Sequence, residues 1–265
     1  MKKLMALLLA LVMVMSLAAC GEQKTNENKG DAASGDATPP AEITYAVEAG
    51  SAGEEVAQAN GFKTVAVGSQ ANALMEVDAG PADAAIIDLL MAGAMVGEGT
   101  SYPNLKVTEQ KLNSELYGVG CRKGSDLTSF INSVMSAAYA DGTMVELAKT
   151  YGVQESLLEQ PACEFTAAES DSDVQYIQDK GKLIVGITEF APMDYQDANG
   201  QWIGFDADMA KLVAEKLGVE VEFQIINWDM KVEELDGKQI DCVWNGMTLT
   251  DGVQAAMECS NAYCE

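Results

Sequence analysis

Short apolar runs alternate along most of the chain with longer runs in which apolar side chains recur at helical spacing. Residues 182–187 form an apolar run that ends at a turn, and residues 205–217 carry apolar side chains at helical spacing before a glycine. The first pattern predicts a buried strand and the second an amphipathic helix. We expect further strands at 219–223, which alternates strictly, and at 240–244, which follows another helix.

The earlier part of the chain repeats this alternation. It predicts strands at 44–47, 64–67 and 83–87 and helices at 54–60, 127–140 and 144–151. Strands that alternate with helices favour an α/β fold with a mainly parallel sheet. Ligands of such folds bind beyond the carboxyl ends of the strands, so the loops that follow these strands are the expected place of a site.

The first forty residues follow a different pattern. Lys2 and Lys3, an apolar run over 4–14 and the small residues before Cys20 make residues 1–20 a lipoprotein signal peptide. The apolar run is too short to span a membrane. We therefore expect an extracytoplasmic protein anchored to the cell membrane by a lipid on Cys20. The alternative is cleavage by the ordinary secretory peptidase, with Cys20 incidental.

Residues 21–42 are polar and carry too little apolar surface to fold, which predicts a disordered tether. Two α/β segments follow, at 43–160 and 174–265, and the acidic stretch 161–173 between them predicts a second linker. About 220 residues suffice for one two-lobed protein or for two small domains.

Composition excludes several classes of function. The formal net charge is −25, and no basic stripe with interleaved aromatic residues occurs, so nucleic acid is not an expected partner. The chain has no histidine, which removes histidine-based catalysis and most zinc sites, and we expect no metal and no cofactor. The other five cysteines contain no CxxC pair; buried free thiols are favoured over a bridge such as Cys259 to Cys264.

Six motifs together resemble the family 3 extracellular solute-binding proteins, the polar amino-acid receptors of ABC importers. They lie at 186–193, 204–208, 245–250, 78–80, 83–88 and 141–143. The resemblance implies a two-lobed α/β fold of the type II periplasmic-binding-protein kind. It also implies a small polar solute, an amino acid first of all, and an ABC permease in the membrane as the partner.

The order of these motifs is permuted relative to that family. By the resemblance, 174–265 is the core of lobe 1, whereas 43–160 holds a portion of lobe 2 plus two closing helices that pack on lobe 1. The first elements of lobe 2 have no counterpart, so we expect its sheet to keep an unpaired edge. A circular permutant and a gene rearrangement that joins two tandem copies both explain this order.

Two places in lobe 2 are candidates for ligand binding. Asp88 follows an apolar strand, and its carboxylate suits the α-ammonium of an amino acid, as the resemblance also implies. A helix-capping aspartate would look similar. Ser51 and Ala52 precede a helix whose free N–H groups suit a carboxylate, although Ser51 could equally be a simple N-cap.

In lobe 1, Gly246 allows a close backbone approach and Thr248 offers donors to an anion; an ordinary turn at the end of a strand is the alternative. Phe190 and Trp244 could enclose an apolar side chain or cover a cation, and core packing is their alternative role. Glu189 suits a cationic ligand.

The carboxylate-binding arginine of the family is absent. Val253 stands at its place, and Arg122 is the only arginine in the chain. Backbone N–H groups and Thr248 must then hold a carboxylate, or the ligand is cationic and suits Glu189 and Asp88.

A non-enzymatic receptor for a solute is therefore the first hypothesis. A non-binding remnant of a rearranged gene is the second. An enzyme on the same scaffold is the third, but the chain lacks histidine and any clustered nucleophile and base.

Overall fold

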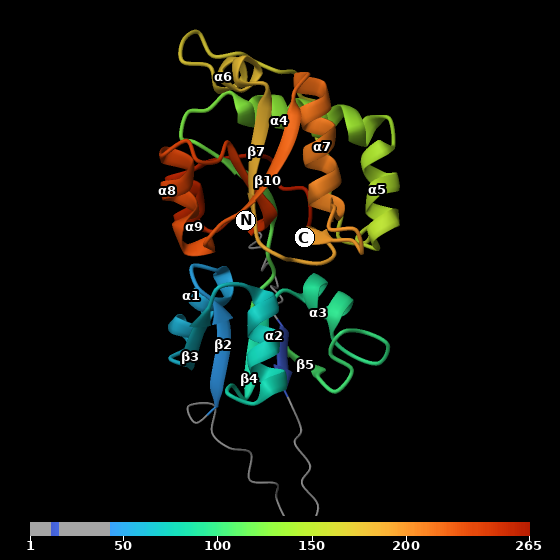
Figure 1. Ribbon diagram of the computed structural model, residues 1–265, viewed down its shortest axis with the longest axis vertical. Helices are drawn as coiled ribbons and strands as arrows, with labels where there is room; N and C mark the ends of the chain where they lie inside the picture. The colour runs from blue at the N-terminus through green and yellow to red at the C-terminus, as the bar shows by residue number, and fades with distance from the viewer. Residues whose placement is uncertain (1–11, 16–42) are drawn as a thin grey trace, which may run out of the picture.

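The chain folds into two α/β lobes stacked end to end (Figure 1). The computed structural model describes residues 12–15 and 43–265. Lobe 2 comprises 12–15 and 43–111, and lobe 1 comprises 117–265. The two-lobed α/β fold expected from the sequence is confirmed. The lipid-attachment residue Cys20, the tether 21–42 and the rest of the signal peptide lie outside the described residues.

Lobe 2 is built on a five-stranded sheet in the order β3-β2-β4-β1-β5. β2 pairs in parallel with β3 and β4, whereas β1 pairs antiparallel with β4 and β5. The bounds of these strands are β1 Val12–Met15, β2 Thr44–Glu48, β3 Lys63–Val67, β4 Ala84–Ile87 and β5 Lys106–Lys111.

Three helices, α1 Ala52–Ala59, α2 Gln70–Ala79 and α3 Leu89–Met95, belong to this lobe. Because side chains alternate along a strand, β2 and β4 supply apolar groups to both faces of the sheet. Tyr45 and Ile86 pack on the side of α1, and Ala46 packs on the side of α2. The inner strands β2 and β4 are therefore buried on both faces, as is typical of parallel sheets.

The strand β1 was not expected. The sequence predicts that its residues belong to the apolar part of a signal peptide and that the sheet of lobe 2 keeps an unpaired edge. In the structure, Val12–Met15 instead pairs with both β4 and β5. The two valines of the run Val-Met-Val-Met favour a strand, and pairing on both sides satisfies backbone groups that would otherwise be left open.

Lobe 1 is built on a second sheet, in the order β10-β7-β11-β6-β12. β7 lies parallel to both β10 and β11, and β6 lies antiparallel to β11 and β12. Only β6 comes from the earlier segment of the chain. The bounds are β6 Tyr117–Cys121, β7 Lys182–Ile187, β10 Glu220–Ile225, β11 Cys242–Thr248 and β12 Glu258–Cys259, with the hairpin β8 Tyr195–Gln196 and β9 Trp202–Ile203 at one side.

Helices cover both faces of this sheet. One face carries α4, α6 and α7, with α5 packed beside α4 and α7, and it buries large side chains such as Trp244 and Phe205. The other face is covered by the short helices around α8 and α9. The bounds are α4 Leu127–Ala140, α5 Thr143–Tyr151, α6 Asp173–Lys180, α7 Phe205–Leu217, η2 Trp228–Met230, α8 Lys231–Asp236 and α9 Asp251–Ala256.

The single arginine lies in lobe 1 and links both segments of the chain. Arg122 follows β6, and its guanidinium contacts Asp173 at 3.0 Å and Asp241 at 3.5 Å. It also donates to the backbone carbonyl of Ile240 at 2.8 Å, while Lys180 pairs with Asp241 at 2.7 Å. The group is buried, so each charge depends on its partners.

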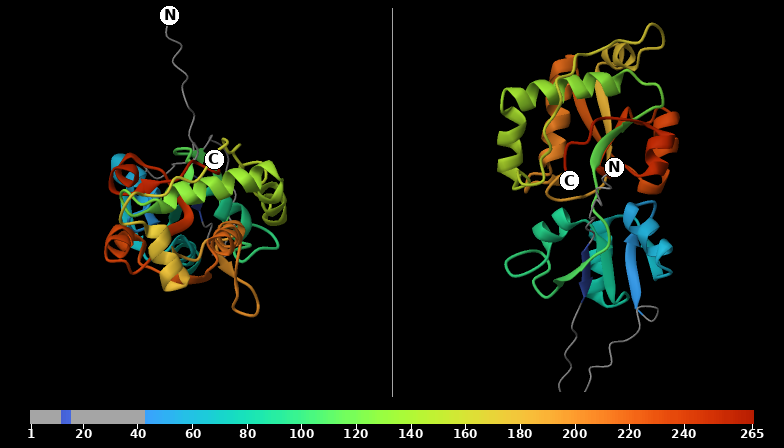
Figure 2. Two further views of the ribbon diagram at one scale, coloured as in Figure 1. Left: turned by 90° about the horizontal axis from the view of Figure 1, so that it is seen from above. Right: turned by 180° about the vertical axis from the view of Figure 1, so that it is seen from behind.

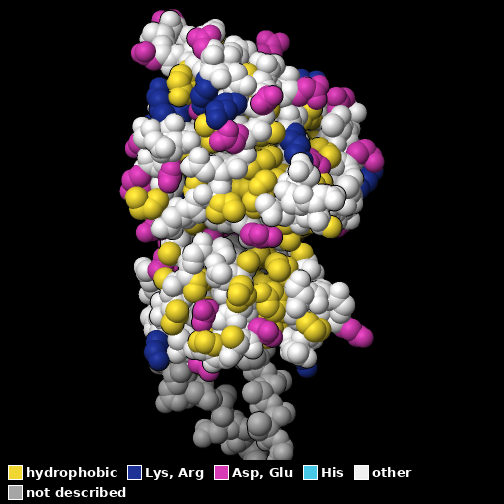
Figure 3. Space-filling view, viewed as in Figure 1, with side chains coloured by type: hydrophobic (Ala, Val, Ile, Leu, Met, Phe, Trp, Pro, Cys, Tyr) yellow, Lys and Arg dark blue, Asp and Glu magenta, His cyan; other side chains and the backbone are white. Residues whose placement is uncertain are grey.

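Within residues 43–265 the backbone passes from lobe 2 to lobe 1 once, through residues 112–116 (Figure 2). This crossing joins β5 to β6. On the face shown in Figure 3, the molecule narrows where the two lobes meet.

Candidate functional site

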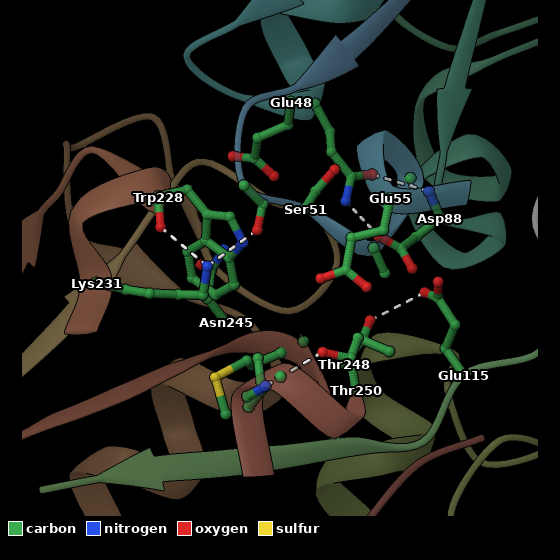
Figure 4. A pocket seen from close by; sticks show the side chains of 18 of the residues that line it. Glu48, Ser51, Glu55, Asp88, Glu115, Trp228, Lys231, Asn245, Thr248 and Thr250 are labelled. Atoms are coloured by element: carbon green, nitrogen blue, oxygen red, sulfur yellow. Dashed lines mark hydrogen bonds between the residues drawn. The ribbon is translucent and has the colours of Figure 1, made fainter. Parts of the chain in front are cut away.

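A cavity of about 160 Å³ lies between the two lobes. Lobe 2 lines it with the ends of β2 and β4 and the start of α1. Lobe 1 lines it with η2, α8, β11 and the start of α9 (Figure 4). Since its walls belong to different lobes, any change in the separation of the lobes changes the cavity.

The topology of lobe 2 gathers acidic side chains on this wall. β2 and β4 are parallel, so their carboxyl ends meet at one edge of the sheet, where open α/β folds place ligands. Glu48 is the last residue of β2, and Asp88 follows β4 directly. Both side chains are buried and line the cavity.

Asp88 stands at the N-cap position of α3, but its side chain makes no capping hydrogen bond. Its Oδ1 accepts from the hydroxyl of Tyr117 at 2.6 Å, and its Oδ2 accepts from the amide of Gln70. The geometry does not favour a capping role for this side chain. Its role toward an ammonium group remains a prediction.

Glu48 is the most deeply buried acid in the cavity wall, with 3% of its surface exposed. Its Oε1 has no hydrogen-bond partner among the described residues. Burial, followed by the nearby charge of Asp88, raises the pKa of Glu48 to about 8. The site therefore contains a carboxyl group that lacks the solvation its charged form requires.

Of the residues that the structure describes, Lys231 is the only cationic one that lines the cavity. Its ammonium donates to the carbonyl oxygen of Gly50 in lobe 2 at 2.9 Å and to that of Trp228 at 3.1 Å. It also lies 5.0 Å from the centre of the Trp228 ring. Burial lowers the pKa of Lys231. Lys231 of lobe 1 thus forms a direct hydrogen bond to Gly50 of lobe 2.

Glu115 lies on the crossing segment and bonds to lobe 1. Its Oε2 accepts from the hydroxyl of Thr248 at 3.1 Å and its Oε1 accepts from Asn113 at 3.0 Å. Burial and the neighbouring charge of Asp88 raise the pKa of Glu115 to about 10. Glu115 and Asp88 thus form one acidic end of the cavity, and Glu48 lies toward the other (Figure 4).

Five of the residues predicted from the sequence line the cavity: Asp88, Ser51, Ala52, Gly246 and Thr248. Ser51 also has the N-cap role that was its alternative, because its hydroxyl accepts from the N–H of Glu54 at 3.1 Å.

Three other predicted residues lie elsewhere. Phe190 and Trp244 are 2% and 0% exposed in the core of lobe 1 and do not line the cavity, which favours their core-packing alternative. Glu189 is exposed and also lies outside the cavity wall.

The backbone of Gly246 has a packing role. Its φ is +56°, and a Cβ atom there would lie 2.2 Å from the ring of Phe190. Its N–H donates to Asp206 at 2.6 Å, so this group is already used. The alternative role of Gly246, a turn at the end of the strand, is not seen, because β11 continues through Gly246 to Thr248.

Several lining residues were missed: Glu48, Glu55, Glu115, Trp228 and Lys231. A signal existed for Glu48, because it ends a predicted parallel strand just as Asp88 follows one. The remaining four lie on a helix start, the crossing segment and the turn after β10. No local pattern marks these as facing one cavity.

Among residues 12–15 and 43–265, no three His, Cys, Asp or Glu side chains gather where they could hold a metal ion. Within the same residues, no helix combines the length and the apolar character of a membrane span. The cysteines Cys121, Cys163, Cys242, Cys259 and Cys264 are all free, so the alternative bridge from Cys259 to Cys264 is not formed.

Comparison with known proteins gives one matching family. Residues 183–265 match the model of the bacterial extracellular solute-binding proteins, family 3. The L-cystine-binding protein TcyJ of Escherichia coli (strain K12) is 32% identical over 88 residues, which cover 33% of this chain and 33% of that protein. The arginine-binding extracellular protein ArtP of Bacillus subtilis (strain 168) is 34% identical over 85 residues, which cover 32% of this chain and 33% of that protein.

Among solved structures, an ancestral cyclohexadienyl dehydratase shares 36% identity, with a TM-score of 0.32; the match covers 33% of this chain and 37% of that one. The chain spans about a third of the length of the curated relatives it matches. Both of these relatives are named as binding proteins. The family resemblance expected from the sequence is confirmed over residues 183–265, which are similar to the bacterial extracellular solute-binding proteins, family 3.

Proposed function

We propose that this chain is the solute-binding lipoprotein of an ABC importer and captures a small polar solute, an amino acid first of all, between its lobes. The observation that carries this proposal is the cavity, whose polar walls come from both lobes. A solute that contacts both walls stabilises the closed arrangement, because it binds that arrangement better than the open one.

Each part of an amino acid finds a chemical partner in the cavity. Asp88 supplies a carboxylate for an ammonium group, and hydrogen bonds between such charged groups are the stronger kind. The N–H groups at the start of α1, near Ser51, are donors to a carboxylate, and the hydroxyl of Thr248 becomes one when it leaves Glu115. The role requires no bond to be made or broken, so the proposed protein is not an enzyme.

We also propose a location and a partner for the chain. The signal peptide supports an extracytoplasmic chain held at the cell membrane by a lipid on Cys20. The family supports an ABC permease as the partner that receives the closed form. The permuted order of the motifs supports a circular permutant or a rearranged gene.

A second candidate is a non-binding remnant of a rearranged gene. The observation that favours it is β1, which comes from residues that signal processing would remove. Without β1, the place between β4 and β5 would be open, and lobe 2 would lose part of its sheet.

A thermal-shift screen of the purified chain against the common amino acids tests the proposal. A ligand at 100 times its dissociation constant stabilises by about 2.7 kcal/mol, and a protein of this size gains about 2–4 °C per kcal/mol. We expect at least one amino acid to raise the melting temperature by several degrees in a saturable manner. The remnant hypothesis predicts no shift with any of them.

A further inference from the structure

The wall of the cavity is rich in acidic side chains. Four acidic side chains line it, Glu48, Glu55, Asp88 and Glu115, against the single cation Lys231. An amino acid would place its own carboxylate among these acidic side chains. A ligand that carries only positive charges would bring no carboxylate into the cavity.

The two ends of the cavity each present an acidic group. At one end, Glu48 points into the space (Figure 4), and its Oε1 has no partner among the described residues although only 3% of the surface of this residue is exposed. At the other end, Asp88 and Glu115 lie together, close enough for their charges to interact. A buried carboxyl oxygen without a partner is costly unless a ligand supplies one.

Groups that could receive a carboxylate are scarce in this cavity. Arg122 is engaged with Asp173 in the core of lobe 1, and Val253 presents an apolar side chain to the cavity. The N–H of Gly246 already donates to a buried aspartate. At the start of α1 the free N–H groups lie beside Glu55, whose charge opposes the entry of a second anion.

The cation is organic rather than a metal ion. A metal requires several ligands around one point, and no such group of three acidic, cysteine or histidine side chains exists among the described residues. The acids are divided between two ends instead. That division suits a ligand with two separated positive charges and an apolar chain between them, beside Trp228 and Val253.

We propose that the cavity selects a short linear diamine, with one ammonium at Glu48 and the other at Asp88 and Glu115, over the amino acid that carries the same amines plus a carboxylate. This proposal rests on the proposed solute-binding function and narrows its ligand class. The charge-assisted bonds form at both ends, and no carboxylate is left without a partner.

Binding should release protons. Burial raises the pKa of Glu48 to about 8 and that of Glu115 to about 10, so both acids hold protons near neutral pH when the cavity is empty. The charged groups that face them are Asp88, Glu55 and Lys231. An entering dication favours the ionised acids, so affinity rises as the pH rises from 6 towards 8.5.

Calorimetric titration with matched pairs tests this selection, since cadaverine is lysine without its carboxylate and putrescine is ornithine without its carboxylate. We expect each diamine to bind at least tenfold more tightly than its amino acid and to release protons, seen as a dependence of the heat on the buffer. If lysine or ornithine binds more tightly than its diamine, the proposal is overturned while the solute-binding function stands. If no ligand of any class binds, both fail.

Two variants sharpen the result. Glu48→Gln keeps the shape of the side chain and should weaken diamine binding at least tenfold, whereas the exposed Glu98→Gln should leave it unchanged. Val253→Arg places a guanidinium in the cavity wall and should move the preference from cadaverine towards lysine by at least tenfold. An unchanged preference in a folded Val253→Arg protein, or equal diamine affinity in Glu48→Gln, would overturn the proposal.

Discussion

Replacement of Glu48 by glutamine should make the empty protein more stable at high pH and leave it unchanged at low pH. The pKa of Glu48 is raised to about 8 from an ordinary value of 4.5, because the charged form is poorly solvated in its buried position. In the unfolded chain the same carboxyl ionises freely near pH 4.5. The folded chain must hold the proton or bear the cost of a buried charge.

The size of the effect follows from the displacement of the pKa. One pKa unit corresponds to about 1.4 kcal/mol, and pH 7 lies about two and a half units above 4.5, so Glu48 costs the fold about 3 kcal/mol at pH 7. The folded pKa is the higher one, so stability is fully present below pH 4.5 and is lost as the pH rises towards 8. Glutamine cannot ionise and avoids this loss.

Urea denaturation at pH 4.5, 7 and 8.5 measures the difference. We expect Glu48→Gln to match the wild type at pH 4.5, to exceed it by about 3 kcal/mol at pH 7 and by about 4–5 kcal/mol at pH 8.5. The exposed Glu98→Gln serves as the control and should show no such divergence. A Glu48→Gln protein that is less stable than the wild type by the same amount at every pH would refute the reasoning, because it would show a lost contact instead of a removed charge.

Three further predictions concern other parts of the chain. Arg122→Gln should lower the free energy of unfolding by about 3–5 kcal/mol, because it leaves buried acids without their partner, whereas Lys149→Gln in an exposed pair should cost less than about 1 kcal/mol; urea denaturation distinguishes them, and equal losses would contradict the structure. Cys20→Ala should release the protein from washed membranes, and identical partitioning would show that Cys20 carries no lipid. A chain that begins at residue 20 lacks β1, so hydrogen exchange in β4 and β5 should be faster than in the full chain while β7 and β11 stay slow; equal protection of β4 and β5 would contradict the pairing of β1.

The regular elements of both lobes were largely predictable. The helix predicted over residues 205–217 is α7, and the strand predicted over 182–187 is β7. In both places periodicity and the glycines at the ends agree, so local and tertiary preferences coincide. The strand predicted over 240–244 begins later and continues to Thr248, because pairing with β6 extends it through Gly246.

The site was predictable only where one element determines it. Asp88 follows an apolar strand, and the edge rule for parallel sheets indicates its place directly. Lys231 and Glu115 reach the cavity through the way the lobes face each other, which no local pattern encodes. Phe190 shows the opposite case, because an aromatic residue near a predicted site can simply fill the core.

The measurement that tests the central claim most directly is a calorimetric titration of the wild type, Asp88→Asn and Asp78→Asn with the solute found in the screen. Asp88 lies in the wall of the cavity, whereas Asp78 is an exposed aspartate of the same lobe outside it. We predict one site per chain in the wild type and in Asp78→Asn, and a loss of about 2 kcal/mol or more in binding for Asp88→Asn. Unchanged binding in a folded Asp88→Asn protein, or equal losses in both variants, would contradict the placement of the solute between the lobes.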